Sequence, residues 1–193
     1  MWIDPETGLL DAAPYSSSPN RDLRPDPAEI TLLVVHGISL PPGEFGGDWI
    51  ERLFTNRLDP ATHPAFESLA GLRVSAHLLI RRDGELQQFV PFHERAWHAG
   101  RSCWQGRTGC NDFSVGVELE GTDETPYTGA QYQRLAGVVE ALASAYPRFD
   151  GRSVVGHSDI APERKTDPGP AFDWWRLDAM AGANGSIARG VQA

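Results

Sequence analysis

Four apolar residues in a row, Leu32–Val35, are the feature that most limits how this chain can fold. An uninterrupted apolar run, here preceded by Thr31, is typical of a strand that is buried on both faces at the centre of a sheet. His36 follows this run directly. Binding and catalytic residues of α/β proteins gather at the carboxyl ends of such strands, so His36 is a candidate functional residue. The alternative is a core histidine bonded to the backbone, because a lone histidine is a weak motif.

Periodicity and turn signals predict further elements around this strand. In chain order they are a helix capped by Asp48, a hairpin of strands 73–80 and 85–90 around Asp83-Gly84, a strand over 114–121, a helix opened by a capping box at Thr128, a short strand at 154–155 and a helix capped by Asp173. This mixture of helices and strands predicts an α/β fold in a single domain.

The expected elements divide the chain into three segments. Residues 1–29 are rich in proline, serine and aspartate and show little periodicity, which predicts an extended arm packed on the domain. Residues 30–181 hold all the expected elements and form the domain itself. Residues 182–193 are mostly small or polar and contain glycine, which predicts a flexible C-terminal tail.

The charge of the chain argues against several kinds of partner. Its formal net charge is -9 and its pI is about 5.1, which disfavours nucleic acid and anionic membranes as ligands. No apolar run approaches the ~20 residues of a membrane helix. The acidic N-terminus lacks the basic and apolar regions of an export signal. We therefore expect a cytoplasmic protein with no nucleic-acid or membrane partner.

Cys103 and Cys110 are the only cysteines of the chain. We interpret them as free thiols in a reducing compartment, with a short-loop disulfide as the alternative. Their spacing is not the C-x₂₋₄-C that is typical of structural zinc sites. The cysteines therefore agree with a cytoplasmic location and do not predict a metal site.

The segment 155–170 is dense in residues that carry chemistry. His157 opens it, three prolines stiffen it, and it then presents Lys165 and Asp167 two residues apart. Stiff loops of this kind hold reactive groups on a rigid scaffold. Imidazole nitrogen and carboxylate oxygen are ligands of zinc, so His157 and Asp167 are candidate ligands and His36 is the candidate third. Two histidines and a carboxylate with an open fourth position form a catalytic zinc pattern, although spacing alone is a weak signal.

Other candidates for the same site remain open at this point. Glu118 and Glu120 project to one face of the strand over 114–121. Either this is the solvated face of an edge strand, or one of the two carboxylates is directed at the metal. His77 is a spare candidate ligand, although its position within a strand favours a packed residue behind the site.

Several blocks of the sequence match those of a known family. They are Leu33–His36, Ile38–Gly47, Arg73–His77, Ala96–Gly100, Cys110–Ser114, Glu118–Asp123 and Ala161–Pro170. From about residue 16 to residue 177, the chain resembles the zinc-dependent N-acetylmuramoyl-L-alanine amidases, specifically the cytoplasmic AmpD type. The long ungapped block that ends at Pro170 is far more specific than the spacing of three ligands.

The resemblance implies an α/β fold with a mixed central β-sheet flanked by helices. It also implies a zinc ion, Zn²⁺, held by His36, His157 and Asp167. It implies cleavage of the amide between the lactyl group of (1,6-anhydro-)N-acetylmuramic acid and the L-alanine of the stem peptide, in cytoplasmic peptidoglycan recycling. Amide hydrolysis needs a general base and a cation near the developing oxyanion. The resemblance gives these roles to Glu118 and Lys165.

The expected substrate, an anhydro-muropeptide, carries several carboxylates, and arginine is the side chain best suited to bind them. We expect Arg73, Arg107 and Arg164 to bind this substrate, together with Trp97 and His98. Arg73 and Arg164 each lie within a matching block. An equally good interpretation of Arg107, in a polar loop, is an ordinary solvated charge.

One position departs from the family pattern, and two other functions compete with the amidase. Gly37 stands where we expect asparagine in close relatives, which removes a side-chain contact to the substrate and leaves the metal site intact. The first competitor is a non-catalytic peptidoglycan-binding module of the same fold, which is expected to lack a ligand, the glutamate or the lysine. The second is another zinc hydrolase, but neither HExxH nor a Cys-x-x-Cys pair occurs. We expect the amidase to act as a monomer.

Overall fold

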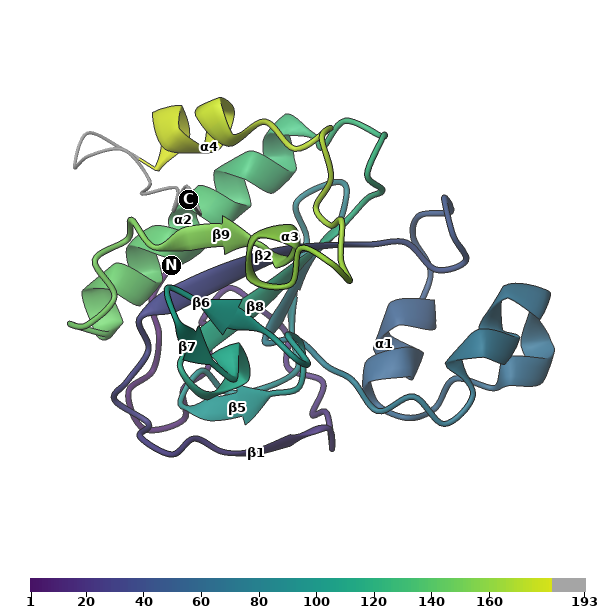
Figure 1. Cartoon of the computed structure of the whole chain (residues 1–193), viewed down its shortest axis with the longest axis horizontal. Helices are drawn as coiled ribbons and strands as arrows, with labels where there is room; N and C mark the ends of the chain where they lie inside the picture. Colours follow the sequence, from purple (N-terminus) through teal and green to yellow (C-terminus); the bar gives the residue numbers. More distant parts are fainter. Residues whose placement is uncertain (182–193) are drawn as a thin grey trace.

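The computed structural model describes residues 1–181, which are built around a sheet of five strands in the order β4-β3-β8-β2-β9. The strands are β2 (Leu32–Ile38), β3 (Leu78–Ile80), β4 (Leu86–Gln88), β8 (Ser114–Glu120) and β9 (Val154–Gly156). β4 is antiparallel to β3, whereas the other neighbours pair in parallel. The predicted single α/β domain with a mixed central sheet is therefore confirmed (Figure 1).

Strand β2 is buried on both faces, as its apolar run predicts. Leu33 and Val35 belong to the main core with residues of α2 (Gly129–Ala145), whereas Leu32 and Val34 belong to a second apolar cluster. Successive side chains of a strand alternate between its two faces, so these clusters lie on opposite sides of the sheet. α4 (Trp174–Met180) packs on α2. Two helices thus cover one face, and the other face is left to short elements and loops.

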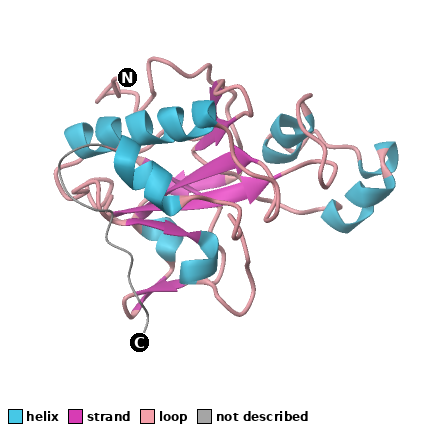
Figure 2. Ribbon diagram, turned by 90° about the horizontal axis from the view of Figure 1, so that it is seen from above, coloured by secondary structure: helices cyan, strands magenta, loops and turns pink. Residues whose placement is uncertain are grey.

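The short elements surround this second face. They are the pair β1 (Arg21–Leu23) and β5 (Glu94–Ala96), the pair β6 (Cys103–Trp104) and β7 (Arg107–Thr108), α1 (Trp49–Phe54), η1 (Pro60–Thr62), η2 (Pro64–Leu69), η3 (Cys110–Asp112) and α3 (His157–Ile160). Figure 2 shows α1 and its neighbouring short helices set apart from α2, with the strands of the central sheet between them.

The caps of two helices agree with their prediction, and one does not. The Thr128 side chain accepts a hydrogen bond from the Gln131 amide, and the Gln131 side chain accepts one from Thr128, which completes the predicted capping box. Asp173 caps α4 through the Arg176 amide. The prediction for Asp48 is wrong: its carboxylate makes no capping bond and instead pairs with Arg52 at 2.8 Å. The arginine one turn along competes successfully for this exposed carboxylate.

The predicted hairpin exists but is shorter than expected. Its register pairs Leu78 with Gln88 and Ile80 with Leu86, and Gly84 in the turn has φ +87°, where a side chain would be strained. Residues 73–77 precede the strand instead of forming part of it. Several of their polar groups bond to other loops instead, as when the Ser75 amide donates to the Trp97 carbonyl.

The first 29 residues run over the domain and contact it at several points. An isolated bridge pairs Tyr15 with Gln88, and β1 pairs with β5. Ser18, Asn20 and Arg24 are buried, so the segment inserts polar side chains below the surface. The predicted tail, 182–193, lies outside the described residues.

Cys103 is half-buried, Cys110 is buried, and both are free thiols in the structure. Among residues 1–181, no helix has the length and apolar character needed to cross a membrane.

Candidate metal centre

The register of the sheet brings three of the predicted residues to one level. His36 of β2 is the partner of Glu118 of β8, and Val35 is the partner of Gly156 of β9. His157 follows Gly156 directly and begins α3, so it stands beside His36 at the carboxyl ends of the parallel strands. Paired residues of neighbouring strands point to the same face. His36 and Glu118 therefore both point away from α2.

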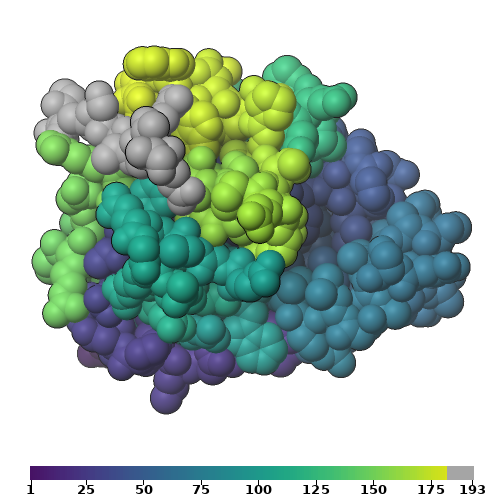
Figure 3. Space-filling view, viewed as in Figure 1, coloured from purple at the N-terminus to yellow at the C-terminus, as the bar shows by residue number. Residues whose placement is uncertain are grey.

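The proline-rich loop returns Asp167 to the same place. The Ser158 amide donates to the Asp167 carbonyl at 2.9 Å, which closes the loop onto the start of α3. His36 Nδ1 lies 2.9 Å from His157 Nδ1, and Asp167 Oδ2 lies 3.1 Å from each of these nitrogens. Within the described part of the chain, this is the one cluster of three metal-binding side chains. Figure 3 shows the loop, in yellow-green, bordering the teal segment around residue 100.

The hydrogen bonds of His157 test whether these residues fit a metal ion. Its Nε2 lies 3.2 Å from the Ala99 carbonyl, which only accepts hydrogen bonds, and 3.5 Å from Arg164 Nη2, which only donates. Because Arg164 Nη2 donates to the Ala99 carbonyl at the much shorter distance of 2.7 Å, the carbonyl is the partner of Nε2, so Nε2 carries the proton and Nδ1 carries a lone pair. That lone pair faces the Asp167 carboxylate, which is another acceptor. Tetrahedral zinc ligands at 2.0–2.2 Å lie about 3.3–3.6 Å from one another, close to the spacing here. The residues therefore fit a bound cation, and the two-histidine, one-carboxylate set fits catalytic zinc.

The protonation states of the cluster favour metal binding. Burial lowers the pKa of His36 from 6.5 to about 4, although the hydrogen bond with Asp167 opposes the shift. Burial alone would raise the pKa of Asp167, but the neighbouring imidazoles of His157 and His36 outweigh it and hold that pKa well below its ordinary value. Metal ligands must be neutral imidazole and ionised carboxylate, and these two pKa shifts favour a neutral His36 and an ionised Asp167 near neutral pH.

Glu118 lies beside this cluster with an incomplete set of partners. Its Oε2 is buried and has no hydrogen-bond partner in the protein. Burial raises the pKa of Glu118 well above its ordinary value, the charge of Asp167 raises it further, and Lys165 opposes both. Buried polar atoms without a partner are rare, so this oxygen is a candidate contact for a ligand.

Lys165 supplies positive charge at the same place. It is the only lysine among 17 basic residues, and its backbone amide donates to the Ala161 carbonyl at 2.9 Å. This turn after α3 brings the half-buried side chain near Glu118 and His36, since its charge affects the pKa of both.

The other candidates for the site have different partners. Glu120 is buried and accepts hydrogen bonds from the Gly46 amide at 2.5 Å and the Arg82 amide at 3.3 Å. It therefore holds the loop that precedes α1 and is not a free carboxylate. His77 is also buried, and its Nδ1 accepts a hydrogen bond from the Gly116 amide.

The five residues predicted to bind substrate have unequal surroundings. Arg73 is exposed, and Trp97 is partly buried with an Nε1 that has no hydrogen-bond partner. Arg107 forms a two-point ion pair with Glu29, at 2.8 and 2.9 Å, and its guanidinium lies 4.0 Å above the Phe113 ring. A guanidinium held this way is not directed toward the metal cluster.

His98 and Arg164 lie at the metal cluster but contact the protein. His98 is buried, with Nδ1 at 2.9 Å from His36 Nε2 and Nε2 at 3.2 Å from Ser114 Oγ. Both of its ring nitrogens thus contact protein groups, and its predicted contact with substrate stays a prediction. Arg164 donates to the Ala99 carbonyl at 2.7 Å and to the Arg101 carbonyl at 3.0 Å.

Sequence reasoning missed two groups next to this centre. They are the carbonyl of Ala99, which accepts from His157, and the side chain of Asn111, which accepts from the amides of residues 98 and 99. Asn111 lies within a block that matches the family, and this was the only sequence signal for its role. No periodicity or spacing indicates that its side chain accepts from these two amides.

Together these features define a class of protein. An α/β domain that presents a two-histidine, one-carboxylate site at the ends of parallel strands, beside a carboxylate with one buried, unpartnered oxygen, has the architecture of a metal-dependent hydrolase. Residues 26–170 match the family model described as N-acetylmuramoyl-L-alanine amidase. The chain therefore belongs to the N-acetylmuramoyl-L-alanine amidase family.

Individual relatives agree with this assignment. The chain is 63% identical over 175 residues to the 1,6-anhydro-N-acetylmuramyl-L-alanine amidase AmpD of Escherichia coli (strain K12), which covers 91% of this chain and 95% of that protein. Its fold is similar to that in a crystal structure of an AmpD derivative, with a TM-score of 0.90 at 59% identity, over 94% of this chain and 100% of the other. It is also similar to AmiD from E. coli, solved in complex with the substrate anhydro-N-acetylmuramic acid-L-Ala-D-γ-Glu-L-Lys, with a TM-score of 0.58 at 30% identity, over 79% of this chain and 57% of that one.

Proposed function

We propose that this chain is a zinc-dependent amidase that cleaves the bond between the lactyl group of 1,6-anhydro-N-acetylmuramic acid and the L-alanine of the stem peptide. The observation that carries this proposal is the convergence of three metal-binding atoms, within 3.1 Å of one another, beside the unpartnered carboxylate oxygen of Glu118. The names of relatives that are 50% identical or more support this substrate class.

His36, His157 and Asp167 would hold the zinc ion. When bound, zinc polarises the scissile carbonyl and lowers the pKa of a water molecule to about 7. The protein's contribution is to keep His36 neutral and Asp167 ionised, as their surroundings favour, and to leave a position open for water and substrate.

Glu118 and Lys165 would carry out the proton transfer and charge stabilisation. Glu118 takes the proton of the attacking water and returns it to the amine of the leaving L-alanine. Its raised pKa suits the first step, because a carboxylate whose pKa lies above its ordinary value is a stronger base toward the attacking water. The Lys165 ammonium group stabilises the negative charge that develops on the carbonyl oxygen.

For the rest of the substrate we propose Arg73, Trp97 and Arg164. The indole N–H of Trp97 is buried without a partner and is available to a substrate acceptor. Arg73 is exposed and Arg164 is partly engaged by backbone carbonyls, so both can also approach carboxylates of the stem peptide.

We also propose that the enzyme acts as a monomer in the cytoplasm, on recycled wall fragments. The free thiols and the acidic composition support this location. Fractionation of the native host would test it: recovery from the periplasm would contradict the proposal.

The competing function is a peptidoglycan-binding module without catalysis. All five predicted metal and catalytic residues are present here, which favours the enzyme. The test compares zinc-loaded wild type with Glu118→Gln on anhydro-muropeptide, with free stem peptide detected by mass spectrometry. We expect peptide release by the wild type and a large loss in the variant at equal zinc content. A wild type that binds the muropeptide but releases no peptide would establish the binding module instead.

A further inference from the structure

Both histidines of the metal centre present Nδ1 to the cluster and direct Nε2 to one segment, residues 97–100. We propose that this segment, here called the outer loop, sets the tautomer of both histidines, with His98 as the positioning residue for His36. This inference rests on the proposed metal site. The motif Ala96–Gly100 has no role in the proposed hydrolytic step, and positioning the two histidines would be its role.

The contact to His157 is made by the backbone of the outer loop. The Ala99 carbonyl accepts from His157 Nε2 at 3.2 Å and from Arg164 at 2.7 Å. Arg164 also donates to the Arg101 carbonyl at 3.0 Å, so one guanidinium fixes the carbonyls on both sides of Gly100. A side chain at Gly100 would meet this guanidinium at 3.2 Å, and φ there is +58°, which favours glycine.

The contact to His36 joins two imidazoles, either of which can be the donor, and the partners of His98 decide which one donates. The Ser114 hydroxyl donates to the Cys110 carbonyl at 2.6 Å, and its oxygen remains as an acceptor 3.2 Å from His98 Nε2. His98 therefore carries its proton on Nε2, and its Nδ1 accepts from His36 Nε2 at 2.9 Å. His36 Nδ1 is left with a lone pair directed at the cluster, which is the form a metal requires.

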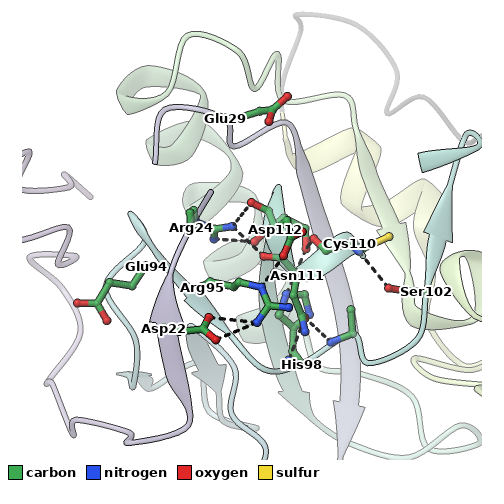
Figure 4. Close-up of polar contacts among 12 residues, drawn as sticks. Asp22, Arg24, Glu29, Glu94, Arg95, His98, Ser102, Cys110, Asn111 and Asp112 are labelled. Carbon is green, nitrogen blue, oxygen red and sulfur yellow. Dashed lines mark hydrogen bonds and ion pairs between the residues drawn. The ribbon is translucent and has the colours of Figure 1, made fainter. Parts of the chain in front are cut away.

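The position of His98 is itself fixed by buried groups. Asn111 Oδ1 accepts from the His98 amide at 3.2 Å and the Ala99 amide at 2.8 Å, and Asn111 is buried (Figure 4). Gly116 of β8 leaves room for the ring, because a Cβ there would lie 2.4 Å from His98 Cγ. The bonds run in one direction, from His36 through His98 and Ser114 to a backbone carbonyl. The tautomer is thus set by the folded chain before any metal binds.

Partners behind a metal ligand are expected to affect metal affinity more than the fold. Loss of such a partner costs about 10–100-fold in metal affinity. The test measures zinc affinity by competition with a chromophoric chelator, for His98→Leu and for His98→Asn. The asparagine side chain keeps an acceptor where Nδ1 stood, whereas leucine removes it and retains apolar bulk.

We expect the zinc Kd of His98→Leu to rise about 10–100-fold and that of His98→Asn to stay within about threefold of the wild type. Circular dichroism and the thermal midpoint show whether each variant is folded. A folded His98→Leu protein with the wild-type Kd would overturn the inference. A wild type that binds no zinc would overturn the proposed function instead, so the two failures are distinguishable.

A second measurement needs no variant and holds even if His98→Leu fails to fold. In metal-free wild type, the ¹⁵N chemical shifts of the imidazoles report which nitrogen carries the proton. We expect His36 and His98 both to carry it on Nε2. A proton on His36 Nδ1, or on His98 Nδ1, would contradict the direction of the chain and overturn the proposal.

Discussion

Two buried polar clusters lie on the same side of the central sheet and are built in opposite ways. In the first, the Arg24 guanidinium is 5% exposed and donates to the carbonyls of Phe92, Asn111 and Ser114 at 3.1, 3.0 and 2.7 Å. Each of these donors meets an acceptor supplied by the chain itself. In the second, His36, His157 and Asp167 direct three potential acceptors at one another.

The difference separates a structural cluster from a functional one. A buried guanidinium with matched acceptors stabilises the segments that it joins, and it needs nothing from outside. Acceptors that face acceptors are costly without a cation, so the second cluster is complete only with a ligand. Both clusters consist of charged or ionisable residues, and the hydrogen-bond partners alone tell them apart.

The largest effect is expected from removing one side of the incomplete cluster. Asp167→Ala leaves two imidazoles, which bind zinc far more weakly than three ligands. We expect the purified variant to contain no stoichiometric zinc and to release no stem peptide above background. Metal analysis by mass spectrometry checks this, with Glu163→Ala, an exposed carboxylate of the same loop, as the matched control. Full zinc content in Asp167→Ala would remove this residue from the site.

The next effect separates catalysis from metal binding. Glu118→Ala and Lys165→Ala should keep zinc and lose kcat by about 10²–10⁴, the usual contribution of a general base or an oxyanion donor. Steady-state kinetics with metal analysis of the same samples provides the measurement. Near-native kcat in either variant would end the role proposed for that residue. Because Lys165 is the only lysine, amine-selective modification offers an independent check on it.

A smaller effect, on stability, is expected for the cluster that is already complete. Arg24→Met leaves several buried carbonyls without donors, and we expect the free energy of unfolding to fall by about 2–4 kcal/mol. Urea denaturation measures it, and zinc stoichiometry should stay at one. Arg148→Met, which removes an exposed pair with Asp26, serves as control and should change stability by less than about 1 kcal/mol. Equal values for the two variants would show that the Arg24 contacts are not stabilising.

The smallest expected effect is a gradual change in the stability of the metal-free protein with pH. The pKa of His36 is lowered from 6.5 to about 4, so the unfolded chain takes up a proton in a range where the folded chain does not. Stability is therefore complete above about pH 6.5 and falls as the pH falls toward 4, by up to about 1.4 kcal/mol per pH unit for each such histidine. Urea denaturation between about pH 4 and about pH 8 would measure this slope. His36→Asn should reduce it, and an unchanged slope would contradict the assignment.

The sequence carried enough information for the fold and for the three residues that the structure brings together as a candidate metal site. The apolar run before His36 predicts a central strand, and the matching blocks point to His157, Asp167, Glu118 and Lys165. These signals are local patterns or family motifs, and both consist of residues that are close together in the sequence.

The contacts between distant residues were not predictable in this way. Arg24 and Ser114, or His98 and His36, are brought together only by the register and by loop packing. Asp48 shows the same limit at short range, because a cap and an ion pair compete for one carboxylate. His98 was expected at the substrate, and its burial against β8 could not be read from its motif.

The central claim is that the convergent acceptors of His36, His157 and Asp167 form one zinc site on which hydrolysis depends. Metal-stripped protein should be titrated with zinc while release of the stem peptide from anhydro-muropeptide is followed. We predict no release without zinc, a linear rise, and a plateau at one equivalent per chain. Undiminished release of stem peptide by the metal-stripped protein, or a plateau at a number of zinc equivalents other than one per chain, would contradict the account.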